Sequence, residues 1–299
     1  MNWKKLLSFA TSESLLLNEP LSRHTTFRVG GPADALFLPT TAQELVQAVQ
    51  LCKEHSLPCL VIGNGSNLLI RDGGVRGLVI KIGDQMADIH ICGTSIHAQA
   101  GALLSAVSRA ALNASLTGLE FAAGIPGSLG GGLVMNAGAY GGEMVQVVRQ
   151  VTALVDGKLV TLSRDQLEMG YRTTWLLKND GIVLEAVLDL KEGDQQQIHA
   201  QMDELNRRRR EKQPLQYPSA GSTFKRPDGY FAGALIEQAG LKGYCIGDAQ
   251  VSELHAGFII NRGHATAADL LALIDYVQKI VYEHSGVRLE TEVRIYGED

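Results

Sequence analysis

The glycine-rich stretch from Gly118 to Gly142 constrains how this chain can fold more than any other feature of its sequence. Many of the 33 glycines crowd there around one proline. Because glycine loses more conformational freedom on folding than any other residue, such crowding indicates a backbone that turns sharply or closely approaches a ligand. Ile125, Leu129 and Leu133 interleave with the glycines, whereas flexible linkers are hydrophilic. The stretch therefore predicts a packed, ligand-binding segment, with a structural turn as the alternative.

A second glycine-containing turn, Gly63-Asn64-Gly65-Ser66-Asn67, directly follows an apolar stretch that we expect to be a strand. Backbone N–H groups in such a turn can converge on a phosphate, and Ser and Asn side chains add donors. The turn is not the Rossmann fingerprint, because position 68 is leucine, and it lacks the lysine of a P-loop. By itself it predicts either a phosphate-binding turn or an ordinary tight turn.

Composition limits the remaining possibilities. A chain of 299 residues, 45% hydrophobic and 20% charged, is long enough for two or three compact globular units. A net charge of −5 gives no reason to expect nucleic acid or an anionic membrane as partner. We expect neither a signal peptide nor a membrane span, because no apolar run is long enough. The cysteines form no C-x-x-C pair, which favours reduced thiols in a cytoplasmic protein; they are Cys52, Cys59, Cys92 and Cys245.

Hydrophobic periodicity predicts a mixture of strands and helices, and hence an α+β or mixed α/β fold. Strands are expected at 33–38, 59–62, 78–82, 89–91, 95–100, 147–155, 182–190, 257–261 and 288–296, and helices at 42–57, 103–114, 194–212 and from about 267. The last helix has apolar residues at i, i+4, i+7 and i+11, which predicts one buried face. The composition changes near residue 190, so we expect a larger N-terminal part and a smaller C-terminal domain.

Three motifs occur together: Arg28-Val29-Gly30-Gly31-Pro32-Ala33, the turn at 63–67, and the segment 123–142. They resemble the FAD-binding domain of vanillyl-alcohol-oxidase-type flavoproteins, and most closely that of the UDP-N-acetylenolpyruvoylglucosamine reductase (MurB) family. The resemblance runs from about residue 21 to the end of the chain. It implies an α+β fold: an N-terminal helical segment (1–20), a two-part FAD-binding domain of the vanillyl-alcohol-oxidase/PCMH type (21–190, subdomains about 21–82 and 83–190), and a smaller C-terminal substrate-binding domain (191–299).

The resemblance implies that the diphosphate of FAD lies on the two glycine-containing loops. Many relatives tether the flavin through a histidine in the first loop. This chain has Asn64 and Ser66 there, so non-covalent FAD is expected. The predicted FAD-binding residues are Gly63, Asn64, Gly65, Ser66, Asn67, Gly124, Ile125, Pro126, Gly127, Ser128, Gly130, Gly131, Asn136, Ala137 and Gly138.

Three residues are implied to be catalytic. Arg172 belongs to a Tyr-Arg pair that is a signature of the family, although the serine usual two residues later is Thr174 here. Ser222 matches the family's proton-donating serine, and Glu292 the glutamate of its closing Glu-Val-Arg motif. Taken alone, each has an ordinary alternative: a surface cation, a turn serine, and a solvated ion pair with Arg294.

A further set is implied to contact the substrate, namely Tyr171, Arg209, Lys212, Arg226 and His255. The role of His255 is the one that the resemblance supports least, since the residue at its position varies between subtypes of the family. The run of four arginines at 207–210 does not favour nucleic acid, because it is short, lacks interleaved aromatics and belongs to an acidic protein; a solvated helix end is its alternative. No histidine spacing suggests a metal site.

The implied activity is NADPH-dependent reduction of UDP-N-acetylglucosamine enolpyruvate to UDP-N-acetylmuramate through FAD, in peptidoglycan precursor synthesis. No second dinucleotide motif is present, so NADPH is expected to use the substrate pocket in turn. No obligate protein partner is evident. Two alternatives remain open at this point: an oxidase of the same FAD-binding superfamily acting on a sugar or alcohol, and a nucleotide-binding protein that has lost the chemistry.

Overall fold

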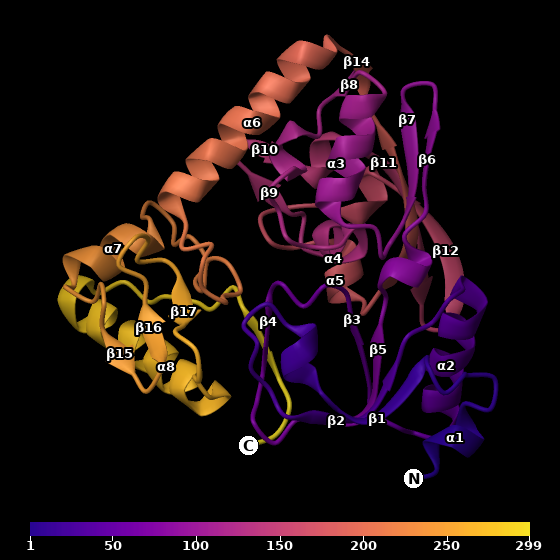
Figure 1. Ribbon diagram of the computed structural model, residues 1–299, viewed down its shortest axis with the longest axis horizontal. Coiled ribbons are helices and arrows are strands. Elements are labelled where there is room, and N and C mark those ends of the chain that lie inside the picture. The colour runs from indigo at the N-terminus through magenta and orange to yellow at the C-terminus, as the bar shows by residue number, and fades with distance from the viewer. The chain divides into compact units, whose positions relative to one another are not determined.

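The structure, a computed structural model, describes residues 1–299 and contains both sheets and helices (Figure 1). The chain forms two compact units, each assembled from separated segments. The first unit comprises Met1–Leu16, Ala35–Asn64 and Gly77–Arg209, and the second comprises Leu17–Asp34, Gly65–Arg76 and Arg210–Asp299. No helix combines the length and the apolar character that crossing a membrane requires.

One sheet has the strand order β1-β2-β5-β3, with β1 at Leu15–Pro20, β2 at Pro32–Phe37, β5 at Val75–Lys81 and β3 at Cys59–Ile62. Strands β3 and β5 run parallel, and helix α2 (Ala42–Glu54) connects β2 to β3. The helix begins where the Thr41 hydroxyl accepts a hydrogen bond from the Glu44 N–H, the usual role of an N-cap threonine. Strands β3 and β2 agree closely with the strands that the sequence predicts at 59–62 and 33–38.

The expectation of a helical segment over residues 1–20 is wrong for its second half. Only α1, Trp3–Leu6, is α-helical, and Leu15–Pro20 forms strand β1 at the edge of the sheet. Pairing with β2 satisfies the backbone of this segment, and a local propensity argument cannot anticipate that pairing.

The second large sheet lies in the first unit and has the order β12-β11-β13-β7-β6, antiparallel throughout. Its strands are β12 (Lys158–Ser163), β11 (Val148–Val155), β13 (Ile182–Asp189), β7 (Ser95–Gln99) and β6 (Ile89–Cys92). Helix α4 (Leu129–Val134) packs against β13 and β7, and α3 (Leu104–Asn113) against β7 and β6. The hairpin between β11 and β12 turns at Asp156 and Gly157, both at positive φ, as a two-residue hairpin requires.

The core of the second unit is built around helix α8 (Ala267–Ser285). Its buried positions include Leu270, Ile274, Val277 and Val281, which confirms the predicted apolar face. A three-stranded antiparallel sheet, β15 (Cys245–Ile246), β16 (Ala249–Val251) and β17 (Ile259–Asn261), packs against it together with α7 (Ala232–Gln238).

The final strand is shorter than predicted. Only β18, Arg294–Tyr296, is regular, and it pairs in parallel with β4 (Leu68–Ile70), beside which it lies in Figure 1. Thr291 instead forms an isolated bridge with Phe224. The alternation over 288–296 therefore belongs to an extended segment that changes its pairing partner midway.

The remaining elements are short, apart from helix α6 (Gln195–Lys212), in which Ile198 is the buried residue. They are β8 (Leu116–Thr117), β9 (Gly138–Ala139), β10 (Gly142–Glu143), β14 (Lys191–Glu192), α5 (Trp175–Lys178) and the 3-10 turns η1 (Leu21–His24), η2 (Asp84–Met86), η3 (Glu120–Ala122), η4 (Met144–Gln146) and η5 (Asp165–Leu167). The polar helix predicted at 194–212 is thus confirmed as α6.

The N-terminus of α8 is capped twice. Thr266 and Asp269 form a reciprocal capping box, and the Asp72 carboxylate accepts hydrogen bonds from the N–H groups of Ala267 and Ala268, both at 2.9 Å. A carboxylate at this end also opposes the positive end of the helix dipole. Asp72 therefore ties the segment Gly65–Arg76 to the helix around which the second unit is built.

We expect Asp72→Ala to destabilise the protein more than Thr266→Ala. Hydrogen bonds to charged groups contribute about 1.5–3 kcal/mol, whereas loss of an N-cap threonine costs about 1 kcal/mol. Urea unfolding of both variants measures the difference. Equal effects, or a larger effect of Thr266→Ala, would show that Asp72 does not hold the helix.

Candidate active site

The end of strand β3 lies directly against the glycine-rich segment. A Cβ on Gly63 would come within 2.2 Å of the Ser128 Oγ, so any other residue would require the Ser128 hydroxyl to move. The Asn64 side-chain amide donates a hydrogen bond to the carbonyl of Pro126. The two loops that the sequence assigns to the cofactor thus touch one another within the first unit.

The glycines of the segment differ in what they permit. A Cβ on Gly130 would come within 2.9 Å of the Ala100 Cβ, and Gly138 closely approaches Glu143 and Gly142, so packing alone explains both. A Cβ on Gly131 would meet nothing nearer than the Ser128 Oγ, at 3.7 Å. Gly131 is exposed, so its open flank leaves room for a ligand.

Three of the other predicted loop residues serve the backbone or the core. Gly127 accepts a hydrogen bond from the Leu104 N–H at 3.0 Å, at the start of α3. Ile125 and Ala137 are partly buried and pack against the core of the first unit. They hold the loop in place whether or not their backbones also contact a ligand.

Asn136 is almost fully buried and adopts a positive φ of 44°. Its side-chain oxygen accepts from the Val145 N–H at 3.0 Å, and its amide donates to Glu143 and to the carbonyl of Gly170, at 2.9 and 3.1 Å. These three side-chain hydrogen bonds all go to the protein itself. Asn136 therefore anchors the turn that follows Gly170.

That turn presents the predicted Tyr-Arg pair. Gly170 and Thr173 exchange backbone hydrogen bonds, leaving Tyr171 and Arg172 at the tip, and Arg172 has a φ of 54°. The Thr174 hydroxyl donates to the carbonyl of Val134 and accepts from the Leu177 N–H. Thr174 is thus the N-cap of α5, a role that either threonine or serine can fill.

Of the four consecutive arginines on α6, Arg209 is the one that meets the glycine-rich segment. A Cβ on Gly124 would lie 2.9 Å from the Cδ of Arg209 and from the Oδ1 of Asn206. Arg207 and Arg208 are exposed and pair with Glu204 instead. Burial lowers the pKa of the Arg209 guanidinium, an effect that Tyr140 partly opposes. The group stays charged, so an anion beside Gly124 would compensate its lost hydration.

In the second unit, the other half of the turn is equally crowded. A Cβ on Gly65 would come within 2.1 Å of the His24 carbonyl oxygen, and the Gly65 carbonyl accepts from the Thr26 N–H. The Thr26 hydroxyl is buried and has no hydrogen-bond partner in the protein. Buried hydroxyls are ordinarily bonded, so a ligand atom next to Gly65 would satisfy it.

Backbone pairing joins the segment that contains Ser222 to the segment that contains Glu292. The Thr223 carbonyl accepts from the Glu292 N–H at 2.8 Å, and Lys225 donates to the Glu290 carbonyl. Asn67 also binds the segment that contains Glu292. Its side-chain amide donates to the Glu292 carbonyl, and its backbone carbonyl accepts from the Arg294 N–H. Residues far apart in sequence therefore meet around the two predicted catalytic side chains, both half-buried.

The predicted substrate contacts of the second unit are exposed or half-buried. The guanidinium of Arg226 lies 4.1 Å from the centre of the Phe231 ring, and Lys212 is exposed at the end of α6. The His255 Nδ1 accepts from the Gly257 N–H at 3.1 Å, so the proton of the neutral ring is on Nε2. Burial lowers the pKa of His255, which favours this neutral, donating form. Arg172 and Arg209 belong to the first unit.

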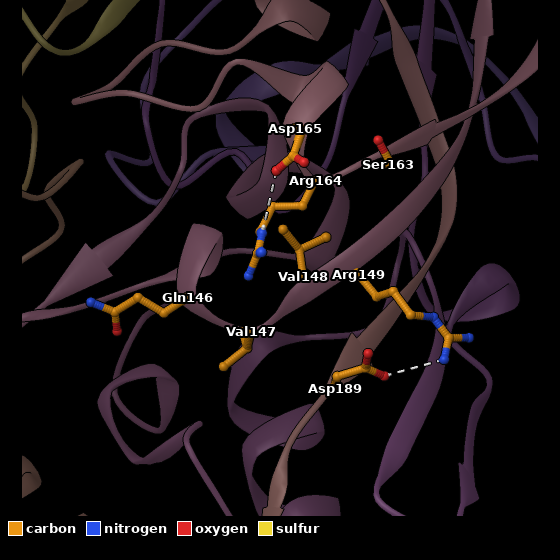
Figure 2. A pocket seen from close by; sticks show the side chains of 8 residues that line it. All are labelled: Gln146, Val147, Val148, Arg149, Ser163, Arg164, Asp165 and Asp189. Carbon is orange, nitrogen blue, oxygen red and sulfur yellow. Dashed lines mark hydrogen bonds and ion pairs between the residues drawn. The ribbon is translucent and has the colours of Figure 1, made fainter.

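A separate pocket of about 250 Å³ lies in the first unit (Figure 2). Its charged side chains are paired, since Arg164 faces Asp165 at 3.8 Å and Arg149 faces Asp189 at 3.4 Å. The lining residues are Gln146, Val147, Val148, Arg149, Ser163, Arg164, Asp165 and Asp189. None of the predicted site residues lines this pocket, and its paired charges give it no preference for an anion.

Sequence reasoning missed two polar residues beside the loops. Thr26 precedes the Arg28–Ala33 motif, but a threonine in a short polar run gives no sign that its hydroxyl is buried. The linking role of Asn67 was also hidden, because its partner Glu292 is 225 positions away. Only a long-range pairing pattern could have revealed either role.

Two family models match the chain. A model of an FAD binding domain matches residues 33–163, and a model of the UDP-N-acetylenolpyruvoylglucosamine reductase C-terminal domain matches residues 213–296. These matches define the class, a flavoprotein with an FAD-binding domain followed by a reductase C-terminal domain.

Curated relatives identify the family. UDP-N-acetylenolpyruvoylglucosamine reductases from Clostridium botulinum (strain Alaska E43 / Type E3) and Clostridioides difficile (strain 630) are 52% and 51% identical to this chain. The alignments cover 94% and 98% of this chain and 93% and 97% of the relatives. The chain belongs to the UDP-N-acetylenolpyruvoylglucosamine reductase family, which confirms the resemblance read from the sequence.

Solved structures agree on the fold. The crystal structure of the reductase MurB from Thermus caldophilus superposes with a TM-score of 0.82 at 38% identity, covering 94% of this chain and 98% of that one. An alkyldihydroxyacetonephosphate synthase matches with a TM-score of 0.50 at 15% identity, over 63% of this chain and 40% of that one. The latter likeness concerns the fold alone. The predicted α+β class, with its FAD-binding domain, is confirmed.

The unpartnered hydroxyl of Thr26 leads us to expect that its removal preserves or raises the stability of the apoprotein but lowers its affinity for FAD. In the apoprotein, Thr26→Val removes a buried hydroxyl without a bond, so we expect unchanged or higher stability, by up to about 1 kcal/mol. With FAD present, loss of the donor should weaken FAD binding. Unfolding of the apoprotein and fluorescence titration with FAD measure the two effects.

Thr25→Val is the matched control, because the Thr25 hydroxyl is also buried but donates to the Val29 carbonyl at 3.1 Å. This variant should lose stability and keep its FAD affinity. If Thr26→Val destabilised the apoprotein as Thr25→Val does, the hydroxyl of Thr26 would have a protein partner and no ligand role.

The lowered pKa of His255 predicts a pH dependence of stability. The unfolded histidine titrates near 6.5, so below that pH unfolding takes up a proton that the folded state binds less readily. The free energy of unfolding should therefore fall as the pH drops from about 8 to about 5, through the lowered folded pKa. In His255→Gln this contribution should be absent. A constant stability difference between the two proteins across this range would contradict the prediction.

Proposed function

We propose that this protein reduces UDP-N-acetylglucosamine enolpyruvate to UDP-N-acetylmuramate with electrons from NADPH, through bound FAD, as a step of peptidoglycan precursor synthesis. Near full-length similarity to reductases of this kind supports the proposal. The observation that supports it most is the backbone pairing of Thr223 with Glu292, which joins the segment that contains Ser222 to the segment that contains Glu292. A hydroxyl and a carboxylate on paired segments suit proton transfer to the carbon that hydride addition leaves negatively charged.

The residues of the two loops fit a flavin dinucleotide. Gly63 and Gly65 let the turn pack closely against Ser128 and His24, Gly131 has an open flank, and the buried Thr26 hydroxyl lacks a partner. We propose that these loops hold the FAD diphosphate, and that FAD is non-covalent because the turn Gly63–Asn67 contains no histidine. When bound, FAD accepts hydride from NADPH and supplies it to the alkene.

The proposed catalytic roles follow from the charge that reduction creates. Hydride added at the terminal carbon of the enolpyruvyl group leaves negative charge delocalised into its carboxylate. Arg172 and Lys212 stabilise that charge, and Glu292 holds or shares a proton beside it. Ser222 gives a proton to the adjacent carbon, a step that general acid catalysis accelerates by about 10²–10⁴-fold.

The proposed substrate contacts are cationic groups and hydrogen-bond donors. Arg209, half-buried next to Gly124, suits an anionic partner, and the Nε2–H of His255 is available as a donor. We assign Arg226 and Tyr171 to the same substrate. Arginine is well suited to phosphates, because its fork presents several donors in fixed geometry.

The proposal assigns the cofactor and the substrate to different parts of the chain. We propose that residues 21–190 bind FAD and that 191–299 bind the nucleotide sugar, with NADPH and substrate using one pocket in turn. We also place the enzyme in the cytoplasm, with no obligate protein partner. Parallel initial-rate lines for NADPH against substrate would support the shared pocket, and intersecting lines would contradict it.

The decisive experiment separates the two half-reactions of Ser222→Ala. Flavin bleaching by NADPH should proceed as in the wild type, whereas reoxidation by the enolpyruvyl nucleotide sugar should slow by about 10²-fold or more, because the proton donor is lost. Stopped-flow absorbance of the flavin follows both steps.

Ser219→Ala is the matched control, since Ser219 is half-buried in the same segment. It should leave both half-reactions unchanged. Equal slowing of both half-reactions in Ser222→Ala would remove the assigned role of Ser222. A wild-type protein that binds FAD but is not reoxidised by the nucleotide sugar would overturn the proposed substrate.

A further inference from the structure

The hairpin of strands β9 and β10 places the side chain of Glu143 beside the glycine-rich segment. Glu143 pairs with Gly138 across this hairpin. A Cβ on Gly138 would lie 2.7 Å from the Cγ of Glu143, so the stem of the glutamate packs directly on the bare backbone of its partner. The side chain is half-buried, and its carboxylate forms a capping box with Gln146 at the start of η4. The backbone around Glu143 therefore sets the position of its carboxylate.

That carboxylate binds the buried side chain of Asn136. An asparagine side chain has an acceptor oxygen and a nitrogen with two donor protons. In Asn136 the oxygen accepts from the Val145 N–H at 3.0 Å. The nitrogen donates to the Glu143 Oε2 at 2.9 Å and to the Gly170 carbonyl at 3.1 Å. Both donors are thus used, and the bond to Glu143 helps to fix the orientation in which the amide reaches Gly170.

The turn that Asn136 reaches carries Arg172. Both ends of this turn are tied to the same stretch of the glycine-rich segment, Gly170 through the Asn136 amide and the Thr174 hydroxyl through the Val134 carbonyl. Arg172 has a φ of 54°, an unfavourable conformation for a residue with a side chain, which persists only where the surrounding structure enforces it. We therefore expect the turn to relax when one of these ties is weakened.

We propose that Glu143 is a positioning residue for Arg172. Acting through Asn136, its carboxylate holds the turn in the conformation in which the Arg172 guanidinium stabilises the charge that hydride addition creates. This role rests on the proposed function of Arg172 in alkene reduction. Electrostatic stabilisation depends on groups that are oriented before the reaction begins, so a loosened turn lowers the rate even though the arginine is still present.

The test follows the two half-reactions of the FAD-loaded Glu143→Ala variant by stopped-flow absorbance of the flavin. Reduction by NADPH should proceed as in the wild type. Reoxidation by the enolpyruvyl nucleotide sugar should slow by about 10–10²-fold, since a misplacement of about 1 Å can cost about 10²-fold. Glu143→Gln keeps an oxygen that can accept from Asn136, so it should retain most of the rate. Equal slowing in both variants would overturn the role of this hydrogen bond.

A double-mutant cycle shows whether Glu143 acts through Arg172. If it does, Glu143→Ala should slow reoxidation little further in a protein that already carries Arg172→Ala, because the two residues then act as a unit. Slowing that adds in full would show that Glu143 acts independently of Arg172, and the proposal would be wrong.

Glu44→Ala is the matched control. Glu44 is also a half-buried glutamate of the first unit. Its carboxylate likewise accepts two hydrogen bonds near the start of a helix, from the N–H and the hydroxyl of Thr40 at 2.7 and 2.9 Å. This variant should lose stability and leave reoxidation unchanged. Similar slowing in Glu44→Ala would reduce the effect of Glu143 to general destabilisation.

Trypsin reports on the turn without any substrate, because it cleaves after Arg172 and cleavage requires local opening of the chain. In FAD-loaded Glu143→Ala, this bond should be cut several-fold faster than in the wild type or in Glu44→Ala. Unchanged cleavage would show that Glu143 does not hold the turn. Faster cleavage, together with a wild-type flavin that the nucleotide sugar does not reoxidise, would instead remove the proposed substrate and leave the link between Glu143 and the turn standing.

Discussion

The turn Gly63–Asn67 depends on two missing side chains. A Cβ at Gly63 would meet Ser128 at 2.2 Å, and one at Gly65 would meet the His24 carbonyl at 2.1 Å. Any other residue would push these neighbours apart. Because the bare backbone fits so closely, the amide of Asn64 can reach Pro126 and that of Asn67 can reach the Glu292 carbonyl. Within the first unit Asn64 thus contacts the glycine-rich segment, and within the second unit Asn67 contacts the Glu292 segment.

Backbone hydrogen bonds hold the segments that carry the candidate catalytic residues. Arg172 is at the tip of a tight turn whose first residue, Gly170, accepts a hydrogen bond from the Asn136 side chain. Ser222 directly precedes Thr223, whose carbonyl accepts from the Glu292 N–H. Groups held in this way are set before a ligand arrives. Such preorganisation is what electrostatic and acid catalysis require, because little reorganisation is then needed in the reaction.

The success of sequence reasoning varied with the range of the interaction. The buried face of α8 and the polar helix α6 were predicted from local spacing. The strand at Leu15–Pro20 was missed, since its partner β2 is what makes it a strand. The glycines show the same difference between local and long-range information. Their crowding is evident in the sequence. Only the contacts of the folded chain distinguish Gly130, which packs against Ala100, from Gly131, beside which there is free space.

The sequence by itself determined the class of protein, the two glycine loops and most of the regular elements, because glycine chemistry and hydrophobic periodicity act over a few neighbouring residues. Tertiary structure alone decided that Leu17–Asp34 and Gly65–Arg76 join the C-terminal unit, and that Asp72 caps α8. It also decided that the Thr26 hydroxyl is buried without a hydrogen-bond partner in the protein. These features depend on hydrogen bonds and packing between residues that are far apart in the sequence. Such contacts leave no periodic pattern in a single sequence from which they could be predicted.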